Sequence, residues 1–110
     1  SEARETIERW YKSFPEVRAW QDAAMASGGD GGARTLFGRS RPIRELDSNV
    51  WARRNHARRV ATNSPVQGSA ADIVVNAMLG LSWSPTLQRL GYRQLLQIHD
   101  EVILEGPEEH

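Results

Sequence analysis

The feature that most constrains this chain is a pair of apolar, β-favouring runs at residues 95–98 and 102–104, separated by three polar residues. These are His99, Asp100 and Glu101. Runs of this length around a short polar break predict a β-hairpin whose turn carries an imidazole and two carboxylates. Acidic groups beside apolar strands are costly unless a cation or a basic partner offsets them. The turn is therefore the first candidate for a functional site.

The size and composition of the chain predict a folded domain, or one piece of a larger one. It has 110 residues, of which 39% are hydrophobic and 25% charged, which is ordinary for a globular protein. No apolar run approaches the roughly 20 residues that a membrane-spanning helix needs, so we expect no membrane partner. The absence of cysteine excludes disulfides and thiolate metal sites. The N-terminus has neither an initiator Met nor a secretory pattern, so we expect the interior of a longer protein.

Charge is distributed unevenly along the chain, although the formal net charge is zero. Residues 1–33, 34–59 and 60–110 carry −2, +6 and −4. All eight bases of the middle segment are arginine, whose planar donor fork suits phosphate oxygens and base edges. Arg54 and Arg58 have the spacing of neighbours on one helix face, where like charges repel unless an anion lies along them. The segment is a candidate nucleic-acid surface, and a solvated helix face is the alternative.

Periodicity and punctuation predict several helices and two hairpins. The first expected helical stretch covers residues 2–26, with a break at Phe14–Pro15. A second helix is expected over 48–61, with a cap at Ser48 or Asn49. A third is expected from Ser64 onward, and a short fourth from Ser84–Pro85 to Leu90, where Gly91 ends it. A flexible loop is expected at residues 27–32, and a strand, a turn at Gly38 and a return strand over 35–43.

The helix predicted from Ser64 has the start signals of a capping serine, a proline at the first position and a glutamine at the third. An apolar stripe follows and predicts packing on a core; it comprises Val66, Ala70, Ile73, Val74, Ala77, Met78 and Leu81. Small residues near the start, at 68–71, allow close approach of a strand or a ligand.

Several kinds of chemistry are disfavoured by the residues. There is no GxSxG nucleophile motif or phosphate-binding GxxxxGK[ST] loop, and the three histidines lack zinc-site spacing. His99 and Asp100 are neighbours on a strand-like segment and point to opposite faces, so they do not form a catalytic dyad. Asp100 can bind Mg²⁺, which prefers oxygen ligands, although another acidic ligand must then come from elsewhere. An acidic turn without a ligand remains the alternative.

Three segments in order carry a resemblance to a known family. TLFGRSR at 35–41, RRVATNSPVQGSAAD at 58–72 and LLQIHDEVILEGP at 95–107 together resemble the C-terminal polymerase region of family A DNA polymerases. With RNH at 54–56, the set is most similar to the organellar enzymes of plants and algae. The resemblance implies a plastid or mitochondrial location, or the bacterial cytoplasm if the chain is of bacterial type.

The resemblance also implies roles for individual residues. Asp100 matches the second metal-binding aspartate, and Glu101 matches an accessory acidic residue near the metals and the primer end. His99 matches a histidine that contacts the primer terminus. A further set, Arg59, Asn63 and Gln67, matches residues along the minor groove near the primer end. The alternatives are a capping-box partner for Gln67 and a helix-start turn for Asn63.

For the whole chain, the resemblance implies an α+β fold in which helices pack on a small antiparallel sheet with a central β-hairpin, as part of a polymerase palm domain. Residues 1–33 would form the edge of the fingers and residues 34–110 a portion of the palm. The expected partners are a DNA primer–template, held in part by Arg39, Arg41 and Arg54, and deoxynucleoside triphosphates, with Mg²⁺ as cofactor.

The family's first metal aspartate and its nucleotide-binding lysine and arginine have no counterpart in this sequence. We therefore expect a fragment of a DNA-directed DNA polymerase that does not catalyse alone. The competing classes are a non-catalytic nucleic-acid-binding module, in which the acidic turn is inert, and a structural remnant.

Overall fold

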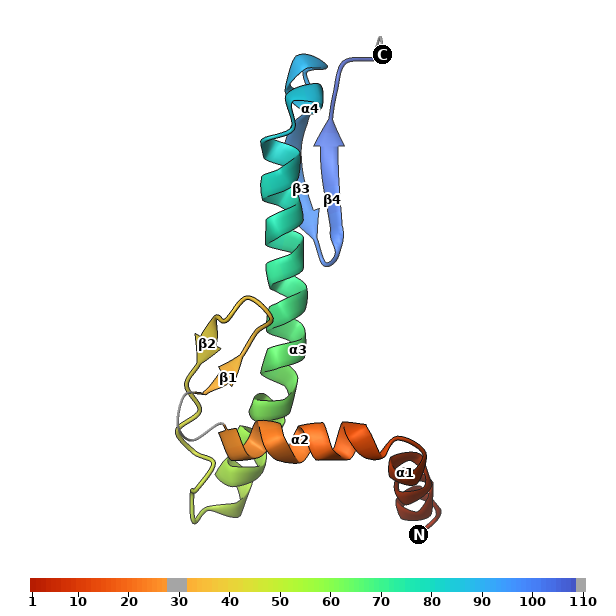
Figure 1. The fold of residues 1–110 in the computed structure, drawn as a ribbon, viewed down its shortest axis with the longest axis vertical. Helices are drawn as coiled ribbons and strands as arrows, with labels where there is room; N and C mark the ends of the chain where they lie inside the picture. The colour runs from red at the N-terminus through yellow and green to blue at the C-terminus, as the bar shows by residue number, and fades with distance from the viewer. Residues whose placement is uncertain (28–31, 109–110) are drawn as a thin grey trace. The chain divides into compact units, whose positions relative to one another are not determined.

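A computed structural model describes residues 1–27 and 32–108 (Figure 1). The described residues divide into two compact units, the first ending at Ser69 and the second beginning at Ala70. Most of the glycine-rich loop expected at residues 27–32 lies outside the described residues. The described residues form helices and two small antiparallel sheets, so the α+β class is confirmed. The sheet differs from the prediction in being two separate two-stranded pieces. None of the described helices is long and apolar enough to cross a membrane.

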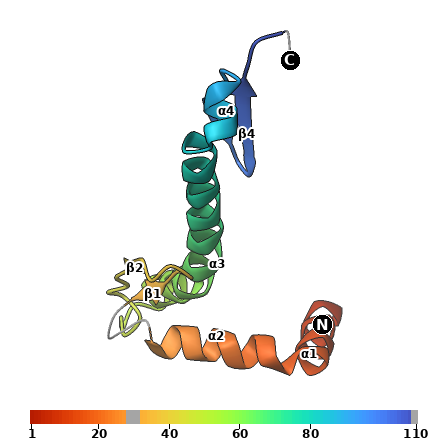
Figure 2. The ribbon, with the colours of Figure 1, turned by 45° about the horizontal axis from the view of Figure 1, so that its top comes forward.

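The first unit opens with two helices, α1 (Glu2–Ser13) and α2 (Pro15–Ser27), which meet at an elbow (Figure 2). The predicted break at Phe14 is confirmed. Proline has no amide hydrogen and disfavours helical geometry in the residue before it, and Phe14 accordingly has φ −132° and ψ 66°. The amide of Phe14 still closes α1 by donating to the carbonyl of Trp10 at 3.0 Å.

A small hairpin follows, in which β1 (Ala33–Arg34) pairs with β2 (Ser40–Arg41). The predicted turn at Gly38 and the return strand are confirmed, but β1 lies before the predicted range of 35–43, and each strand has only two residues. Gly38 has φ 82° in the connecting loop, a left-handed conformation that glycine adopts without steric cost. Thr35 anchors this loop, because its amide donates to the carbonyl of Arg39 and its carbonyl accepts from the amide of Gly38.

The long helix α3 (Trp51–Ser82) is continuous through Pro65, so the prediction of a separate helix starting at Ser64 is wrong. The start signals are not used: Ser64 Oγ accepts a hydrogen bond from Arg41 at 3.2 Å instead of capping a helix. A proline inside a helix costs roughly 3 kcal/mol. Contacts on either side of Pro65 offset that cost, because Ala57 and Ala61 are fixed in the core and Ser69 Oγ donates to the Pro65 carbonyl.

The first turn of α3 also differs from the prediction. The helix begins at Trp51, and Ser48 Oγ accepts from the amide of Val50 two residues later. Ser48 thus shapes the turn that leads into α3 rather than the first turn of the helix.

The core of the described chain is small and lies in the first unit. Its four buried residues are Ala33, Ile43, Ala57 and Ala61, and Met25, Leu46 and Val60 pack against it. The core therefore joins the end of α2, the β1–β2 segment and the first half of α3. This packing fixes the helix that carries the candidate nucleic-acid residues.

The second unit contains the C-terminal part of α3, α4 (Pro85–Arg89), β3 (Arg93–Ile98) and β4 (Glu101–Glu105). The predicted short helix is confirmed, with Ser84 Oγ accepting from the amide of Leu87 and Gly91 at φ 76° beyond its end. The predicted hairpin is also confirmed. It runs alongside α3, where Gln94 Nε2 donates to the carbonyl of Met78 at 2.7 Å (Figure 1).

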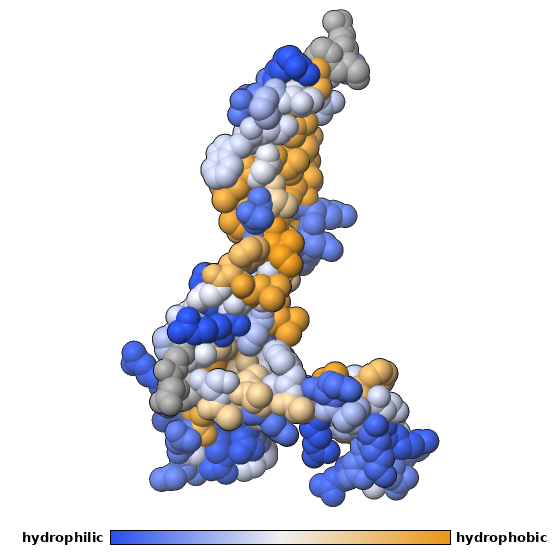
Figure 3. Space-filling view, in the orientation of Figure 1, coloured by the Kyte–Doolittle hydropathy of each residue, from blue (hydrophilic) through white to orange (hydrophobic). Residues whose placement is uncertain are grey.

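The apolar stripe of α3 does not pack on a buried core, contrary to the prediction. No described residue of the second unit is buried, and Ile73 is 53% exposed. A single two-stranded hairpin covers too little of a helix to bury an apolar stripe. Figure 3 shows the resulting hydrophobic surface over the C-terminal half of α3 and the β3–β4 hairpin.

Candidate nucleic-acid interface and metal-binding turn

The β3–β4 turn consists of two residues, His99 and Asp100, between the paired residues Ile98 and Glu101. His99 has φ 53°, the one left-handed conformation among the described non-glycine residues. This region is uncommon outside glycine, although asparagine, aspartate and histidine enter it more readily than other residues. His99, Asp100 and Glu101 are all exposed, so the hairpin presents an imidazole and two carboxylates at its tip.

The tip supplies hard oxygen ligands but not a complete metal site. Among the described residues, no three histidine, cysteine, aspartate or glutamate side chains gather closely enough to hold a metal ion. Mg²⁺ commonly binds through one or two carboxylates and completes its octahedron with water and substrate phosphates. The donor chemistry of Asp100 fits that pattern, and further ligands would have to come from outside the hairpin.

A second group of candidates lies along α3. Arg59, Asn63 and Gln67 are all exposed and are spaced four residues apart, which places them on one face of a helix. At 1.5 Å per residue they span about 12 Å, the length of three to four base pairs at roughly 3.4 Å each. Each side chain carries hydrogen-bond donors. The face can therefore offer a row of donors to consecutive base pairs.

The alternatives for two of these residues fail in the structure. Gln67 is not a capping-box partner, because Ser64 lies inside α3 and accepts from Arg41. Asn63 is not in a helix-start turn, because it also lies inside α3. Neither exposed amide has a local structural task that explains it.

The predicted DNA-backbone arginines have partners within the first unit. Arg39 Nη2 donates to the carbonyl of Gly68 at 3.3 Å, and Arg41 Nη1 donates to Ser64 Oγ at 3.2 Å. Both bonds fasten the β1–β2 segment to α3. Arg54 Nη1 donates to the carbonyl of Ser48 at 3.1 Å and is half-buried. These contacts give all three arginines a positioning role inside the unit.

Arg58 and Arg59 differ from the other arginines. Both are exposed, and the described residues offer neither guanidinium a hydrogen bond or an ion pair. Arg58 belongs to the arginine segment predicted as a nucleic-acid surface, although it was not singled out there as an individual DNA-binding residue. The available sequence signal was its unfavourable spacing from Arg54, which an anion would relieve.

Close approach at the small residues of α3 is confirmed for Gly68. A Cβ atom built there would lie 2.6 Å from Thr35 Cγ2, so only glycine lets the β1–β2 loop reach the helix. The amide of Leu36 donates to Ser69 Oγ at 2.9 Å beside it. The loop is thereby held against the same helix that carries Arg59, Asn63 and Gln67.

The structure thus forms two groups of candidate residues. Arg39, Arg41, Arg54, Arg59, Asn63 and Gln67 belong to the first unit, and His99, Asp100 and Glu101 belong to the second.

The described site combines a donor-bearing helix, arginines and an acidic hairpin tip, which are features of a nucleic-acid enzyme. Comparison with known proteins identifies the family. The family model described as DNA polymerase family A matches residues 1–110. The chain belongs to DNA polymerase family A. The resemblance noted from its three segments is confirmed.

Relatives from plants and bacteria resemble this family A chain over nearly its whole length. It is 53% identical over 107 residues to DNA polymerase I A, chloroplastic/mitochondrial, of Arabidopsis thaliana, covering 96% of this chain and 10% of that protein. It is 47% identical over 109 residues to the thermostable DNA polymerase I of Thermus aquaticus, covering 98% and 13%. The chain spans about a tenth of the length of these relatives.

A solved polymerase domain has the same fold over this chain. The POL domain of Pol1 from M. smegmatis, in complex with DNA primer–template and dNTP, superposes with a TM-score of 0.89 at 38% identity, covering 98% of this chain and 19% of that one. Membership of a DNA polymerase family implies use of divalent metal in general. The relatives include both organellar and bacterial enzymes.

Proposed function

We propose that this chain is part of a DNA-directed DNA polymerase that adds deoxynucleotides to a primer 3′ end on a DNA template. The observation that carries the proposal is the continuous helix α3, which presents Arg59, Asn63 and Gln67 as an exposed row of donors in a family A chain. The similarity to a polymerase domain in complex with primer–template and dNTP supports the same partners here.

The α3 row suits the minor groove of the primer–template. Purine N3 and pyrimidine O2 are acceptors at every base pair there. Donors at four-residue intervals along α3 can contact these acceptors on successive pairs without reading the sequence, as a polymerase requires. Arg58, whose guanidinium group has no partner in the described chain, suits a neighbouring phosphate.

The hairpin tip suits the reacting end of the primer. Asp100 would hold Mg²⁺, with Glu101 beside it as an accessory acidic group and His99 at the primer terminus. Mg²⁺, when bound, stabilises negative charge on the transferring phosphoryl group. The turn contributes by holding the Asp100 carboxylate exposed at the end of a hydrogen-bonded hairpin.

In this proposal residues 1–33 belong to the edge of the fingers and residues 34–110 to the palm, where Arg39, Arg41 and Arg54 support the DNA backbone. Identity to chloroplastic/mitochondrial enzymes supports a plastid or mitochondrial location if the source is a plant or an alga, and the bacterial cytoplasm otherwise.

Replacing Asp100 tests the proposal in the intact protein that carries this chain. Asn is isosteric with Asp and preserves the turn, but it loses the charge that holds the metal. Because metal stabilisation is worth several kcal/mol, Asp100→Asn should lower the rate of single-nucleotide incorporation by on the order of 100-fold or more. Asp22→Asn, which changes an exposed carboxylate on α2, is the matched control and should extend primers normally.

Two outcomes would contradict the proposal. Near-normal incorporation by Asp100→Asn would remove the metal role from the hairpin tip. An intact wild-type protein that binds primer–template and never extends it would be a non-catalytic nucleic-acid-binding module.

A further inference from the structure

The elbow between α1 and α2 forms an open pocket of about 400 Å³. Its lining residues are Arg4, Ile7, Glu8, Tyr11, Lys12 and Arg18. All of them belong to the first unit, and none has a role in the proposed catalytic site. The pocket exists because Pro15 breaks the helix and turns α2 against one face of α1.

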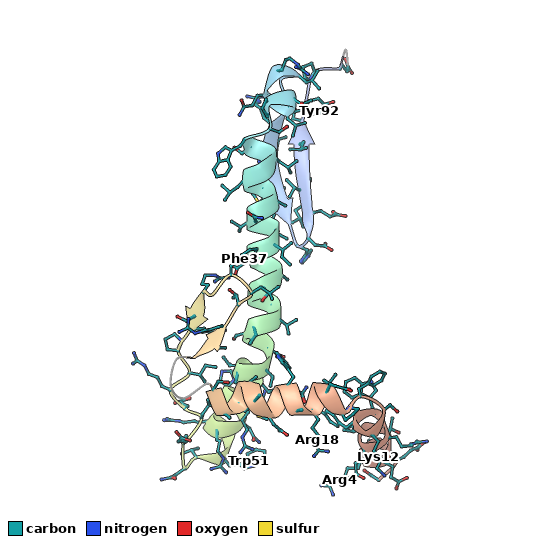
Figure 4. The ribbon with its side chains drawn as sticks, in the orientation of Figure 1. Arg4, Lys12, Arg18, Phe37, Trp51 and Tyr92 are labelled. Carbon is teal, nitrogen blue, oxygen red and sulfur yellow. The ribbon has the colours of Figure 1, made fainter. Side chains whose placement is uncertain are left out.

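Positive charge dominates this pocket. It brings together three cations and one carboxylate, and Figure 4 shows Arg4, Lys12 and Arg18 on the same side of the elbow. Within the described part of the chain, neither the Arg4 nor the Lys12 side chain makes a hydrogen bond or an ion pair. Like charges gathered around one cavity repel, and an anion in the cavity relieves that repulsion.

The third cation is held in place by an aromatic ring. The Arg18 guanidinium lies 5.1 Å from the ring centroid of Tyr11. The Tyr11 hydroxyl in turn donates to Gln21 Oε1 at 2.8 Å. The ring that lines the pocket is therefore tied to α2 at two points, and the pocket is preorganised.

Exposed aromatic rings continue from this pocket along α1. Trp10 meets Tyr11 edge-on at 5.3 Å between centroids and lies 5.2 Å from Phe14. Trp10 is 47% exposed and Phe14 is 49% exposed, beside a helix whose surface is mostly hydrophilic (Figure 3). The elbow thus combines a cationic pocket with a stacking surface beside it.

We propose that the α1–α2 elbow binds single-stranded DNA, with a backbone phosphate in the Arg4–Lys12–Arg18 pocket and an unpaired base stacked on Trp10 and Phe14. Cations that follow the backbone, together with aromatic rings that stack bases, are the usual basis of sequence-tolerant single-strand binding. A duplex satisfies only the cations, because its bases already stack on one another. The strand would be the unpaired template, an identity that rests on the proposed polymerase function.

Fluorescence anisotropy tests this site in the intact protein without metal or nucleotide. The probe is a labelled oligo(dT) of about 12 nucleotides, a length within the usual range of single-strand site sizes. The double variant Arg4→Gln, Lys12→Gln should weaken binding. It should also reduce the slope of log K against log salt by about 0.7 for each phosphate that the variant no longer neutralises. Arg9→Gln removes an exposed α1 charge that does not line the pocket, so its slope should stay that of the wild type.

The aromatic part is tested separately. Trp10→Ala should weaken oligo(dT) binding roughly tenfold and leave binding of a blunt duplex unchanged. Trp83→Ala, at another exposed tryptophan that lies outside the elbow, should change neither.

Identical salt slopes for the pocket variant and Arg9→Gln would overturn the proposal. So would equal losses of duplex and single-strand binding by Trp10→Ala, or a lowered melting temperature for that variant with unchanged affinity. These binding measurements involve no chemistry, so their failure is separable from a failure of nucleotide incorporation.

Discussion

His99 shows how much one residue can reveal about the hairpin. A left-handed φ of 53° at the first position of a two-residue turn favours glycine or asparagine. A bulky imidazole there costs conformational energy that glycine would avoid. Its presence beside Asp100 agrees with the proposed role at the primer end, in which the side chain itself would make the contact. The sequence predicted the turn, but a histidine does not by itself specify a left-handed backbone, although it enters that region more readily than most residues.

Gln67 provides a prediction that separates structure from recognition. Its exposed amide caps nothing, because α3 continues through it. Gln67→Ala should therefore leave the melting temperature of the intact protein unchanged, since alanine is also a good helix former. Loss of a minor-groove donor should weaken extension from mismatched primer ends more than from paired ones. The measurement is a comparison of incorporation rates on the two substrates, with a thermal melt alongside.

Gln88→Ala, which replaces an exposed glutamine on α4, is the control for extension. If Gln67→Ala lowers the melting temperature but extends both substrates normally, Gln67 has a structural role and not a recognition role.

At the scale of elements, α3 marks where sequence reasoning succeeds and where it fails. The stop at Phe14–Pro15, the α4 cap at Ser84 and the β3–β4 hairpin were predicted, because proline, a capping serine and alternating apolar runs act locally. The signals at Ser64–Pro65 are equally strong and misled the prediction. What overrides them is long-range packing of Ala57 and Ala61, which single-residue signals do not encode.

The row of Arg59, Asn63 and Gln67 follows from that same continuity. A break at Ser64 would have divided the three residues between two helices. The resemblance to the family identified the three residues, but only an unbroken α3 places them on one face of a helix.

Two glycines of α3 give a matched test of the packing between the β1–β2 loop and the helix. At Gly68 a Cβ would collide with Thr35 Cγ2, whereas at Gly80 nothing lies within 4 Å. Gly80→Ala should stabilise α3 by about 1 kcal/mol through helix propensity. Gly68→Ala should not show this net stabilisation, because the added methyl group should destabilise the packing of the loop by about 1–3 kcal/mol. Thr35 cannot simply rotate away, because its Oγ1 accepts from the amide of Arg39 at 3.1 Å.

Hydrogen exchange of the α3 and residue 35–39 amides in the intact protein measures both effects. The Gly68 variant should exchange faster at Leu36 and Arg39, whose amides bond to Ser69 Oγ and Thr35 Oγ1. Equal protection in the two variants would show that the loop does not depend on close approach at Gly68.

At the scale of the whole molecule, the small amount of buried apolar surface limits the tertiary stability of this chain without the rest of its protein. The described residues contain only four buried side chains, three of them alanines. Large apolar residues such as Ile73, Leu96 and Ile103 are 42–53% exposed. The sequence correctly indicated amphipathic elements, yet periodicity reports which face is apolar and not what covers it. That is why the predicted core of the α3 stripe was wrong, although the stripe does lie on a helix.

The 110-residue chain expressed alone should therefore form helix without cooperative tertiary structure. Domain stability requires extensive apolar burial to offset chain entropy, and four small or medium buried side chains supply too little. Far-UV circular dichroism should show helical signal that declines gradually on heating, whereas the intact protein should melt in a steep transition. Primer extension by the isolated chain should be undetectable, because its sequence has no counterpart of the family's first metal aspartate or of its nucleotide-binding lysine and arginine. A sharp thermal transition of the isolated chain would show instead that its own contacts suffice to define the fold.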